Sequence, residues 1–505
     1  MRFAGGAVFL ACLSLTAAAE PFALQQRIGS PDDPHRPESL RAIAVSPDGR
    51  LVALAGEAAT PTENHPVQLR EVATGKLIRT LAEHETVVRA IAFSARGDRL
   101  ATITSDTDGV GVVRVFDVET GRRSHVIDAG GHFVQFLPDG RLAATGFGQV
   151  LLFDPATGQE VGRRPTMPIV KDVSRDGRRA VGVSHHGSNA LDVHDLDAAK
   201  SIARLTGSTA EPLVASFSPD GGTVAASDPR SRTVLVWEVL TGQIVHTLEA
   251  GTTVMALAFT RDGRYLIAGG IDDSFRSWEV ATGSDAGSAA AHDGAITVLA
   301  DGPEHMLLSG GTDRTAAVWS LANLNRSTLP APPIADADLD AAWESLASPD
   351  ARTAYRALGL MERNTAQVLP AVRSRVERQL LPVPEADLDR LFAELNNADY
   401  LVRERAAATL ARAGDVLRPQ FEQMLATTDS PEVRARLRLL LDRSGRSSRF
   451  TTGDFLRLRR LIGTVKMLAG DESKRLLTLI ADEFPDPAVA NEALEALERL
   501  GSATE

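Results

Sequence analysis

The chain has 505 residues, enough for two to four domains, and its 43% hydrophobic and 24% charged residues are typical of folded globular proteins. The formal net charge of −12 argues against a nucleic-acid binder, because neutralising phosphates requires a surplus of Lys and Arg. Beyond the N-terminal segment no apolar run reaches 18 residues, so we expect no integral membrane span once that segment is removed.

The N-terminal segment has the pattern of a secretory signal. Arg2 supplies a positive charge, an apolar stretch follows, and Ala17-Ala18-Ala19 has the small-residue form of a signal-peptidase site. We therefore expect residues 1–19 to be a signal peptide cleaved before Glu20. The mature protein would then be periplasmic or held in the cell envelope.

Two alternatives to a cleaved signal remain open. In the first, Phe9-Leu10-Ala11-Cys12 is a lipobox and Cys12 becomes an acylated lipoprotein anchor; in the second, the segment is a buried N-terminal helix. Cys12 is the only cysteine of the chain. Cleavage after Ala19 would therefore remove disulfides, thiolate metal sites and cysteine nucleophiles together.

A four-residue turn motif recurs through the first three hundred residues. Its copies are Ser46-Pro-Asp-Gly49, Ser94-Ala-Arg-Gly97, Leu137-Pro-Asp-Gly140, Ser174-Arg-Asp-Gly177, Ser218-Pro-Asp-Gly221 and Thr260-Arg-Asp-Gly263, with a degenerate seventh near Asp301. Each copy lies between two short apolar segments, and a second motif of the form aromatic-acid-x-x-Thr-Gly follows it, as in Trp237 to Gly242. Four strands in about 40–45 residues is the period of a propeller blade.

These units resemble WD (WD40) repeats over residues 20–323. The resemblance implies an all-β, seven-bladed propeller in which a His, a Ser, an Asp and a Trp of one blade form a hydrogen-bonded tetrad. The seventh unit carries all four as His292, Ser309, Asp313 and Trp319, and the other units carry incomplete sets. In this family an N-terminal strand commonly completes the last blade, so we expect Phe22–Ile28 to pair with the strand that ends at Trp319.

One face of such a propeller commonly binds peptides or partner proteins in WD-repeat proteins. The first strand of each unit starts near that face, and four of the residues there are candidates for partner binding: Arg41, Arg89, His132 and Met255. Because guanidinium groups match carboxylates, acidic peptides or loops are the expected ligands of Arg41 and Arg89. The alternative is ordinary variation of a protein surface.

After a Pro-rich linker at residues 324–337, the apolar period becomes helical, and we expect an all-α domain over residues 338–505. Its short helices resemble HEAT-like repeats, best seen in Asp399–Gly414, which implies a solenoid-like domain. Nine arginines fall within residues 434–460. They would form either a solvated helix face whose stems cover apolar surface, or a patch for an acidic partner.

Sequence motifs for catalysis or cofactor binding are missing. The chain has no Gly-x-Ser-x-Gly, no P-loop and no Gly-x-Gly-x-x-Gly between a strand and a helix. The best metal candidate is His185 and His186 with His194, but no Cys, Asp or Glu accompanies them at ligand spacing, so we expect solvated loop histidines. We accordingly predict no metal, no cofactor and no catalytic residues.

Two functions compete at this point. The leading hypothesis is an exported bacterial scaffold without catalytic activity, in which a propeller and a helical repeat domain bind other proteins. The alternative is an exported, lactonase-like hydrolase with its active site at the central channel, which would require converging ionisable groups there. A subunit of an envelope redox or secretion assembly is a third possibility.

Overall fold

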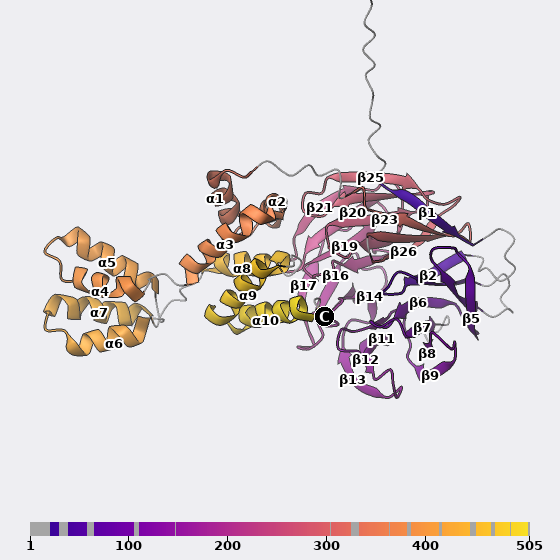
Figure 1. Ribbon diagram of the computed structural model, residues 1–505, viewed down its shortest axis with the longest axis horizontal. Helices are drawn as coiled ribbons and strands as arrows, with labels where there is room; N and C mark the ends of the chain where they lie inside the picture. Colours follow the sequence, from indigo (N-terminus) through magenta and orange to yellow (C-terminus); the bar gives the residue numbers. More distant parts are fainter. Residues whose placement is uncertain are drawn as a thin grey trace, which may run out of the picture.

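The computed structural model describes residues 21–29, 39–57, 65–105, 111–146, 148–303, 305–324, 333–362, 364–380, 385–413, 417–444, 451–465, 470–484 and 486–502. Within these ranges the chain forms 28 strands followed by ten helices (Figure 1). The expected signal peptide, with Cys12, lies outside the described residues. The predicted order of an all-β propeller and an all-α region is confirmed.

The strands form seven four-stranded antiparallel sheets, the blades of a propeller. Blades 1 to 3 are β2 (Ser39–Val45), β3 (Leu51–Glu57), β4 (His65–Glu71), β5 (Leu77–His84); β6 (Val88–Phe93), β7 (Arg99–Ser105), β8 (Gly111–Asp117), β9 (Arg123–Asp128); and β10 (Val134–Phe136), β11 (Leu142–Gly146), β12 (Gln149–Phe153), β13 (Glu160–Pro165). Blades 4 to 6 are β14 (Ile169–Val173), β15 (Arg179–Val183), β16 (Leu191–Asp195), β17 (Lys200–Leu205); β18 (Ala215–Phe217), β19 (Thr223–Asp228), β20 (Thr233–Glu238), β21 (Ile244–Glu249); and β22 (Val254–Phe259), β23 (Tyr265–Gly270), β24 (Ser274–Glu279), β25 (Asp285–Ala290).

Blade 7 takes its strands from both ends of the propeller sequence. It contains β26 (Ile296–Asp301), β27 (Met306–Gly311) and β28 (Ala316–Ser320), and β1 (Ala23–Ile28) pairs antiparallel with β28, with Leu24 opposite Trp319. The ring of Phe22 also packs edge-on against that of Phe275, at 4.7 Å between ring centres. The predicted closure is therefore confirmed, and it covers the edge that β28 would otherwise expose.

The recurring turns explain why the blades form where they do. In blade 1 the hydroxyl of Ser46 donates to Asp48 and accepts the backbone N–H of Leu51 at 2.9 Å, while Gly49 adopts a φ of +73°. A positive φ favours glycine, which has no Cβ to clash with the backbone. Strands alternate in direction, so the turns after the first and third strands of every blade lie on one face, called here the lower face. The opposite one is the upper face.

The ten helices form two separate hydrophobic cores. They are α1 (Asp336–Ser345), α2 (Ala351–Glu362), α3 (Thr365–Leu380), α4 (Glu385–Glu394), α5 (Tyr400–Ala413), α6 (Arg418–Thr427), α7 (Pro431–Ser444), α8 (Thr452–Val465), α9 (Asp471–Glu483) and α10 (Pro487–Ser502). One core joins α1–α3 with α8–α10, which we call the helical layer, and the other joins α4–α7, the outer bundle.

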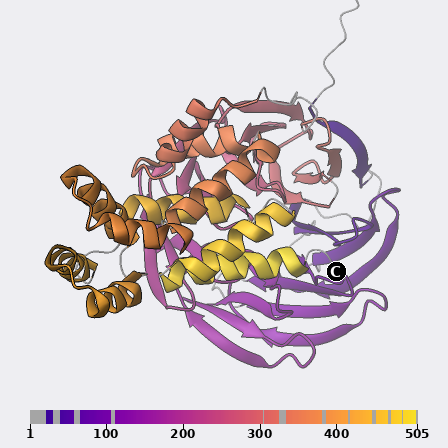
Figure 2. The same cartoon turned by 60° about the vertical axis from the view of Figure 1, so that its left-hand side comes forward.

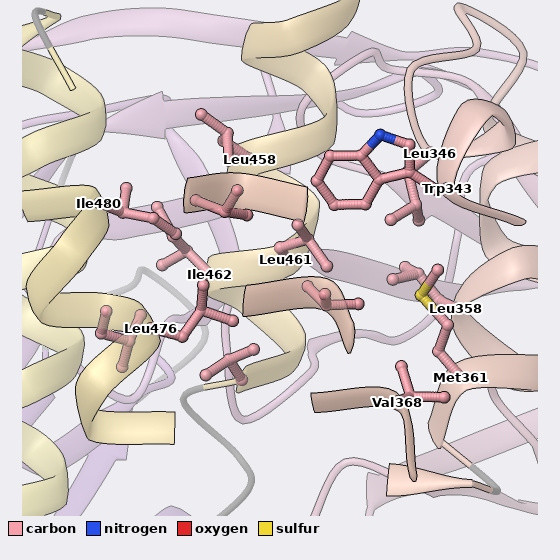
Figure 3. Close-up of a cluster of buried hydrophobic side chains, with 14 of the residues drawn as sticks. Trp343, Leu346, Leu358, Met361, Val368, Leu458, Leu461, Ile462, Leu476 and Ile480 are labelled. Carbon is pink, nitrogen blue, oxygen red and sulfur yellow. The ribbon is translucent and has the colours of Figure 1, made fainter. Parts of the chain in front are cut away.

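The sequence predicts a single solenoid-like row, and the observed order differs from it. The chain leaves the helical layer after α3, builds the outer bundle, and returns to the layer at α8 (Figures 1 and 2). The reason lies in the apolar faces: α8 buries Leu458, Leu461, Ile462 and Val465, at helical spacing, against residues of α1–α3 such as Leu346 (Figure 3). The outer bundle contributes no residue to that core.

The helical layer rests on the lower face of blades 4 to 6. The backbone N–H of Ala351 donates to the side chain of Gln243 at 3.0 Å, and Arg352 donates to the carbonyl of Ile244 at 3.2 Å. Figures 1 and 2 both show the layer against the propeller and the outer bundle standing beyond it. The upper face therefore lies opposite the helices.

Candidate functional site

Three of the four predicted partner-binding residues share a local backbone feature on the upper side. Arg41, Arg89 and Met255 each lie where the pairing of the first and second strands of their blade skips one residue. Such β-bulges re-aim a side chain relative to the regular strand. Arg89 is exposed, whereas Arg41 and Met255 are half-buried.

Positive charge gathers on blades 1 to 4. Loss of surrounding water, and then the charges of Arg89 and Lys171, hold the pKa of His132 below its usual range, so these three groups of blades 2 to 4 share one electrostatic neighbourhood. Arg41 of blade 1 pairs with Glu57 at 2.6 Å, and Lys171 pairs with Glu211 at 3.3 Å. We call Arg41, Arg89, His132 and Lys171 the upper cationic patch. Met255, in blade 6, lies outside it.

Sequence reasoning missed Lys171. Counting back from the turn of blade 4 places Ile169 at the candidate position, but the skipped residue of this blade lies between Val170 and Asp172 and is therefore Lys171 itself. The bulge of blade 4 thus falls later in its strand than those of blades 1, 2 and 6. No motif in the sequence signals that shift.

The four tetrad residues of blade 7 lie in one hydrogen-bonded chain. His292 contacts Asp313 through Nδ1 at 3.0 Å and Ser309 through Nε2 at 2.8 Å, and the indole N–H of Trp319 donates to Ser309 at 3.0 Å. Burial opposes ionisation of Asp313, but the bonds from His292 and from the Thr315 amide hold the pKa of Asp313 well below its usual range. All four groups are engaged with one another, so we assign them to the stability of the blade.

A buried ion pair joins the helical layer to the lower face. Arg460 of α8 donates to both carboxylate oxygens of Glu238 at 2.8 and 2.9 Å, and both side chains are only 2% exposed. Its remaining nitrogen donates to the carbonyls of Leu346 and Ser348, each at 2.7 Å. Every charge-bearing end of this pair is thereby hydrogen-bonded, as a buried pair requires.

The arginine-rich segment 434–460 is therefore put to a use that neither sequence hypothesis described. Besides Arg460, Arg457 is buried: it donates to the carbonyl of Trp343 at 3.0 Å and lies over that ring at 4.7 Å. Arg459 pairs with Glu492 of α10, and Arg436 pairs with Glu404 within the outer bundle. At least these arginines hold helices together or onto the propeller.

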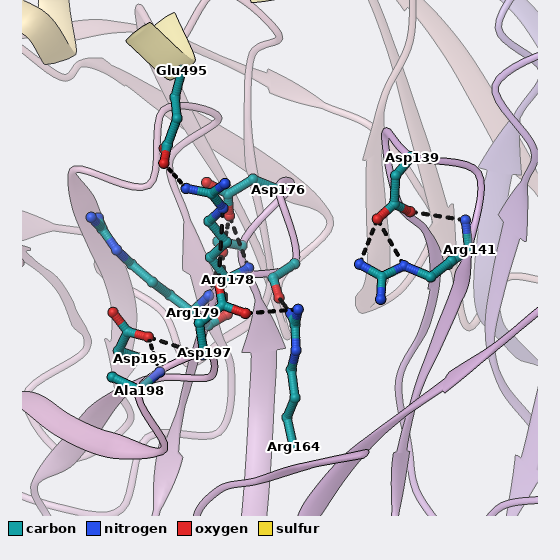
Figure 4. Close-up of polar contacts among 12 residues, drawn as sticks. Asp139, Arg141, Arg164, Asp176, Arg178, Arg179, Asp195, Asp197, Ala198 and Glu495 are labelled. Atoms are coloured by element: carbon teal, nitrogen blue, oxygen red, sulfur yellow. Dashed lines mark hydrogen bonds and ion pairs between the residues drawn. The ribbon is translucent and has the colours of Figure 1, made fainter. Parts of the chain in front are cut away.

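A second ion pair crosses the same boundary further out. Arg178, beside the first turn of blade 4, pairs with Glu495 of α10 (Figure 4). Arg178 also lies 3.9 Å from Asp197, which in turn pairs with Arg164 of blade 3 at 2.7 Å. The contact with the helices thus continues into a charge network between two neighbouring blades.

The histidines considered for metal binding do not form a cluster. His185 and His186 are exposed, with His186 lying 3.9 Å from Glu211, and His194 is half-buried on β16. Within the described parts of the chain, no three His, Cys, Asp or Glu side chains are arranged to hold a metal ion. Nor is any helix there both long and apolar enough to cross a bilayer.

Comparison with known proteins agrees with the fold. Residues 75–110 and 242–279 match the model of the WD40 family, described as the WD domain, G-beta repeat. The chain is thus a seven-bladed β-propeller with WD40 repeats, followed by an all-α region. Proteins built on WD40 propellers are in general interaction scaffolds and are typically not enzymes.

Its similarity to individual proteins is partial. Over 142 residues, 26% of this chain, it is 31% identical to an uncharacterized WD repeat-containing protein, sll1491, of Synechocystis sp.. It is 39% identical over 72 residues to the protein ROOT INITIATION DEFECTIVE 3 of Arabidopsis thaliana, and 34% identical over 70 residues to the nuclear distribution protein PAC1 of Arthroderma otae, each 14% of this chain. The chain spans 39%, 16% and 15% of the lengths of these relatives.

Proposed function

We propose that this protein is a non-catalytic scaffold of the cell envelope whose upper face binds an acidic peptide or loop of a partner protein. One observation carries the proposal: the helical layer occupies the lower face of blades 4 to 6, whereas the upper cationic patch lies opposite it. Among the described residues Arg89 is exposed and has no ion-pair partner, so its guanidinium is available for a carboxylate.

The charge of the whole protein makes this patch selective. A net charge of −12 repels acidic partners in general, so a local group of cations determines where such a partner approaches and in which orientation. Arg41 and Lys171 are partly neutralised by Glu57 and Glu211, and an incoming carboxylate would compete with those two groups. Arg89 would therefore contribute most to binding.

Export belongs to the same proposal. Cleavage before Glu20 would leave β1, which begins at Ala23, complete for its role in blade 7. A mature propeller closed in this way supports a location outside the cytoplasm, in the periplasm or at the envelope.

The experiment compares two charge reversals on the same two blades. Arg41→Glu with Arg89→Glu alters the upper face, and Arg50→Glu with Arg122→Glu, two exposed residues beside lower-face turns, is the matched control. Tagged mature protein would capture partners from an envelope extract, and the affinity for each identified partner would then be measured by calorimetry. We expect the upper pair to weaken binding at least tenfold, since hydrogen bonds to charged groups contribute about 1.5–3 kcal/mol each.

The control makes the assignment decisive. Loss of binding in the lower pair alone would place the partner on the other face, and unchanged binding in both pairs would refute a role for these arginines. Both variants should keep the melting temperature of the wild type, because exposed charges contribute little to stability.

A further inference from the structure

A cavity of about 680 Å³ lies between the helical layer and the lower face of the propeller. Its walls come from the turns of blades 4 to 6 and from α2, α8 and α10. That volume is in the range of pockets that enclose small organic molecules, and such pockets occur preferentially where two structural units meet.

Negative charge dominates the lining. It carries nine Asp and Glu side chains but only five Arg and Lys side chains. Three of those cations already pair with lining carboxylates: Arg264 with Glu279, Arg459 with Glu492, and Arg460 with Glu238. A further carboxylate, Glu495, pairs with Arg178 from outside the lining. The charge balance of the cavity therefore favours a cationic guest.

Two polar groups of the lining lack partners. The hydroxyl of Thr223, a residue 3% exposed, has no hydrogen bond to any described residue. An orphaned hydroxyl in such a place costs free energy unless something binds it. The carboxylate of Glu362, at the end of α2, likewise has neither an ion pair nor a side-chain hydrogen bond within the described chain.

The surroundings of Glu362 show how strongly a positive charge is missing there. Removal of water by the surrounding protein, and then the negative charges of Asp220 and Glu279, raise the pKa of Glu362 to about 7, against which Arg264 acts only in part. The other charged group that faces it is Asp262, which raises the pKa further. A cation in the cavity would reverse this effect and hold Glu362 ionised.

We propose that this cavity binds a small organic cation with ammonium groups, of the class of linear diamines and triamines, between the helical layer and the propeller. An ammonium group only donates hydrogen bonds, which suits the free acceptor sites on Glu362 and Thr223. The apolar chain of such an amine would pack on Leu358 and Tyr355, which also line the cavity. Because both structural units supply walls, the bound amine ties one to the other.

Calorimetry with the full mature chain tests the proposal, with putrescine and spermidine as probes at pH 8 and low ionic strength. We expect saturable binding of one molecule per chain. Glu362→Gln and Thr223→Val should each weaken it about tenfold, which matches the loss of one charge-assisted hydrogen bond. Glu377→Gln is the control, because Glu377 pairs with Arg373 on α3 and does not line the cavity.

The outcomes separate cleanly. Absence of saturable heat up to about 10 mM of either amine would overturn the proposal. So would an equal loss in the Glu377→Gln variant, which would indicate general adsorption to an acidic protein, or equal affinity for Mg²⁺, which would indicate a simple ion. Removing the charge of Glu362 relieves repulsion, so that variant should fold, and Thr223→Val provides an independent, nearly isosteric check. Arg41→Glu with Arg89→Glu should bind both amines like the wild type.

Discussion

Replacing Arg460 by alanine should detach the helical layer from the propeller more effectively than any other single change of charge. The substitution removes the two bonds to Glu238 and those to the carbonyls of Leu346 and Ser348. Glu238 stays 2% exposed, with the hydroxyl of Thr241 at 2.7 Å as its remaining side-chain donor. An uncompensated buried carboxylate is the main consequence.

The expected cost follows from that burial. Breaking a buried ion pair by removing one partner destabilises a protein by about 3–5 kcal/mol, mostly because the other charge is left in a medium of low polarity. For a helical region of this size, such a loss lowers the melting temperature by roughly 10 °C. Arg459→Ala, one position earlier, is the control: its side chain is 35% exposed, and a pair of that kind contributes only about 0–1 kcal/mol.

Circular dichroism at 222 nm measures the effect during urea unfolding, because the helices dominate that signal. Hydrogen exchange of the α2 and α8 amides would localise the loss to the contact with the propeller. Adding Glu238→Gln to Arg460→Ala should restore part of the stability, since the amide is neutral. A loss below about 1 kcal/mol for Arg460→Ala, or a double variant less stable than the single one, would refute this reasoning.

The other predictions concern the two ends of the propeller and its dependence on pH. Deleting residues 20–30 removes β1 and exposes the edge of β28, so the melting temperature should fall and aggregation should rise in light scattering; unchanged values would mean that the ring closes without β1. N-terminal sequencing of the secreted chain should begin at Glu20, and an acylated Cys12 would contradict the predicted cleavage. Burial raises the pKa of Asp301 to about 7, so the folded state retains this proton better than the unfolded chain does. Stability should therefore fall as the pH rises from about 4 to 7, and Asp301→Asn should flatten that part of a curve of melting temperature against pH.

The propeller could be predicted because its signals are local. Each turn motif carries its own hydrogen bonds, as Ser46 does with Asp48 and Leu51, so the sequence around one turn determines one turn whatever the rest of the chain does. Six good copies then define the blades by their spacing. The pairing of β1 with β28 joins residues about 300 positions apart, and only the resemblance to WD repeats made it predictable.

The helical region shows the limit of the same approach. An apolar face with a period of 3.6 indicates that a helix is buried, but it does not say which helix covers it. Leu461 of α8 packs with Leu358 of α2 across a hundred residues of sequence (Figure 3), whereas α7, the helix immediately before α8, belongs to another core. The two cores and the return of the chain at α8 therefore had no counterpart in the sequence pattern.

The arginines make the same point for function. Arg459 and Arg460 are adjacent and chemically identical, yet one is 35% exposed and the other 2% exposed. The difference arises because successive residues of a helix point about 100° apart, so only one of the two faces the carboxylate that blade 5 presents. Charge density along a sequence consequently cannot distinguish a docking surface from an internal contact. It follows that Arg89, exposed on the face opposite the helices, is the better candidate for partner binding than the longer run of arginines at 434–460.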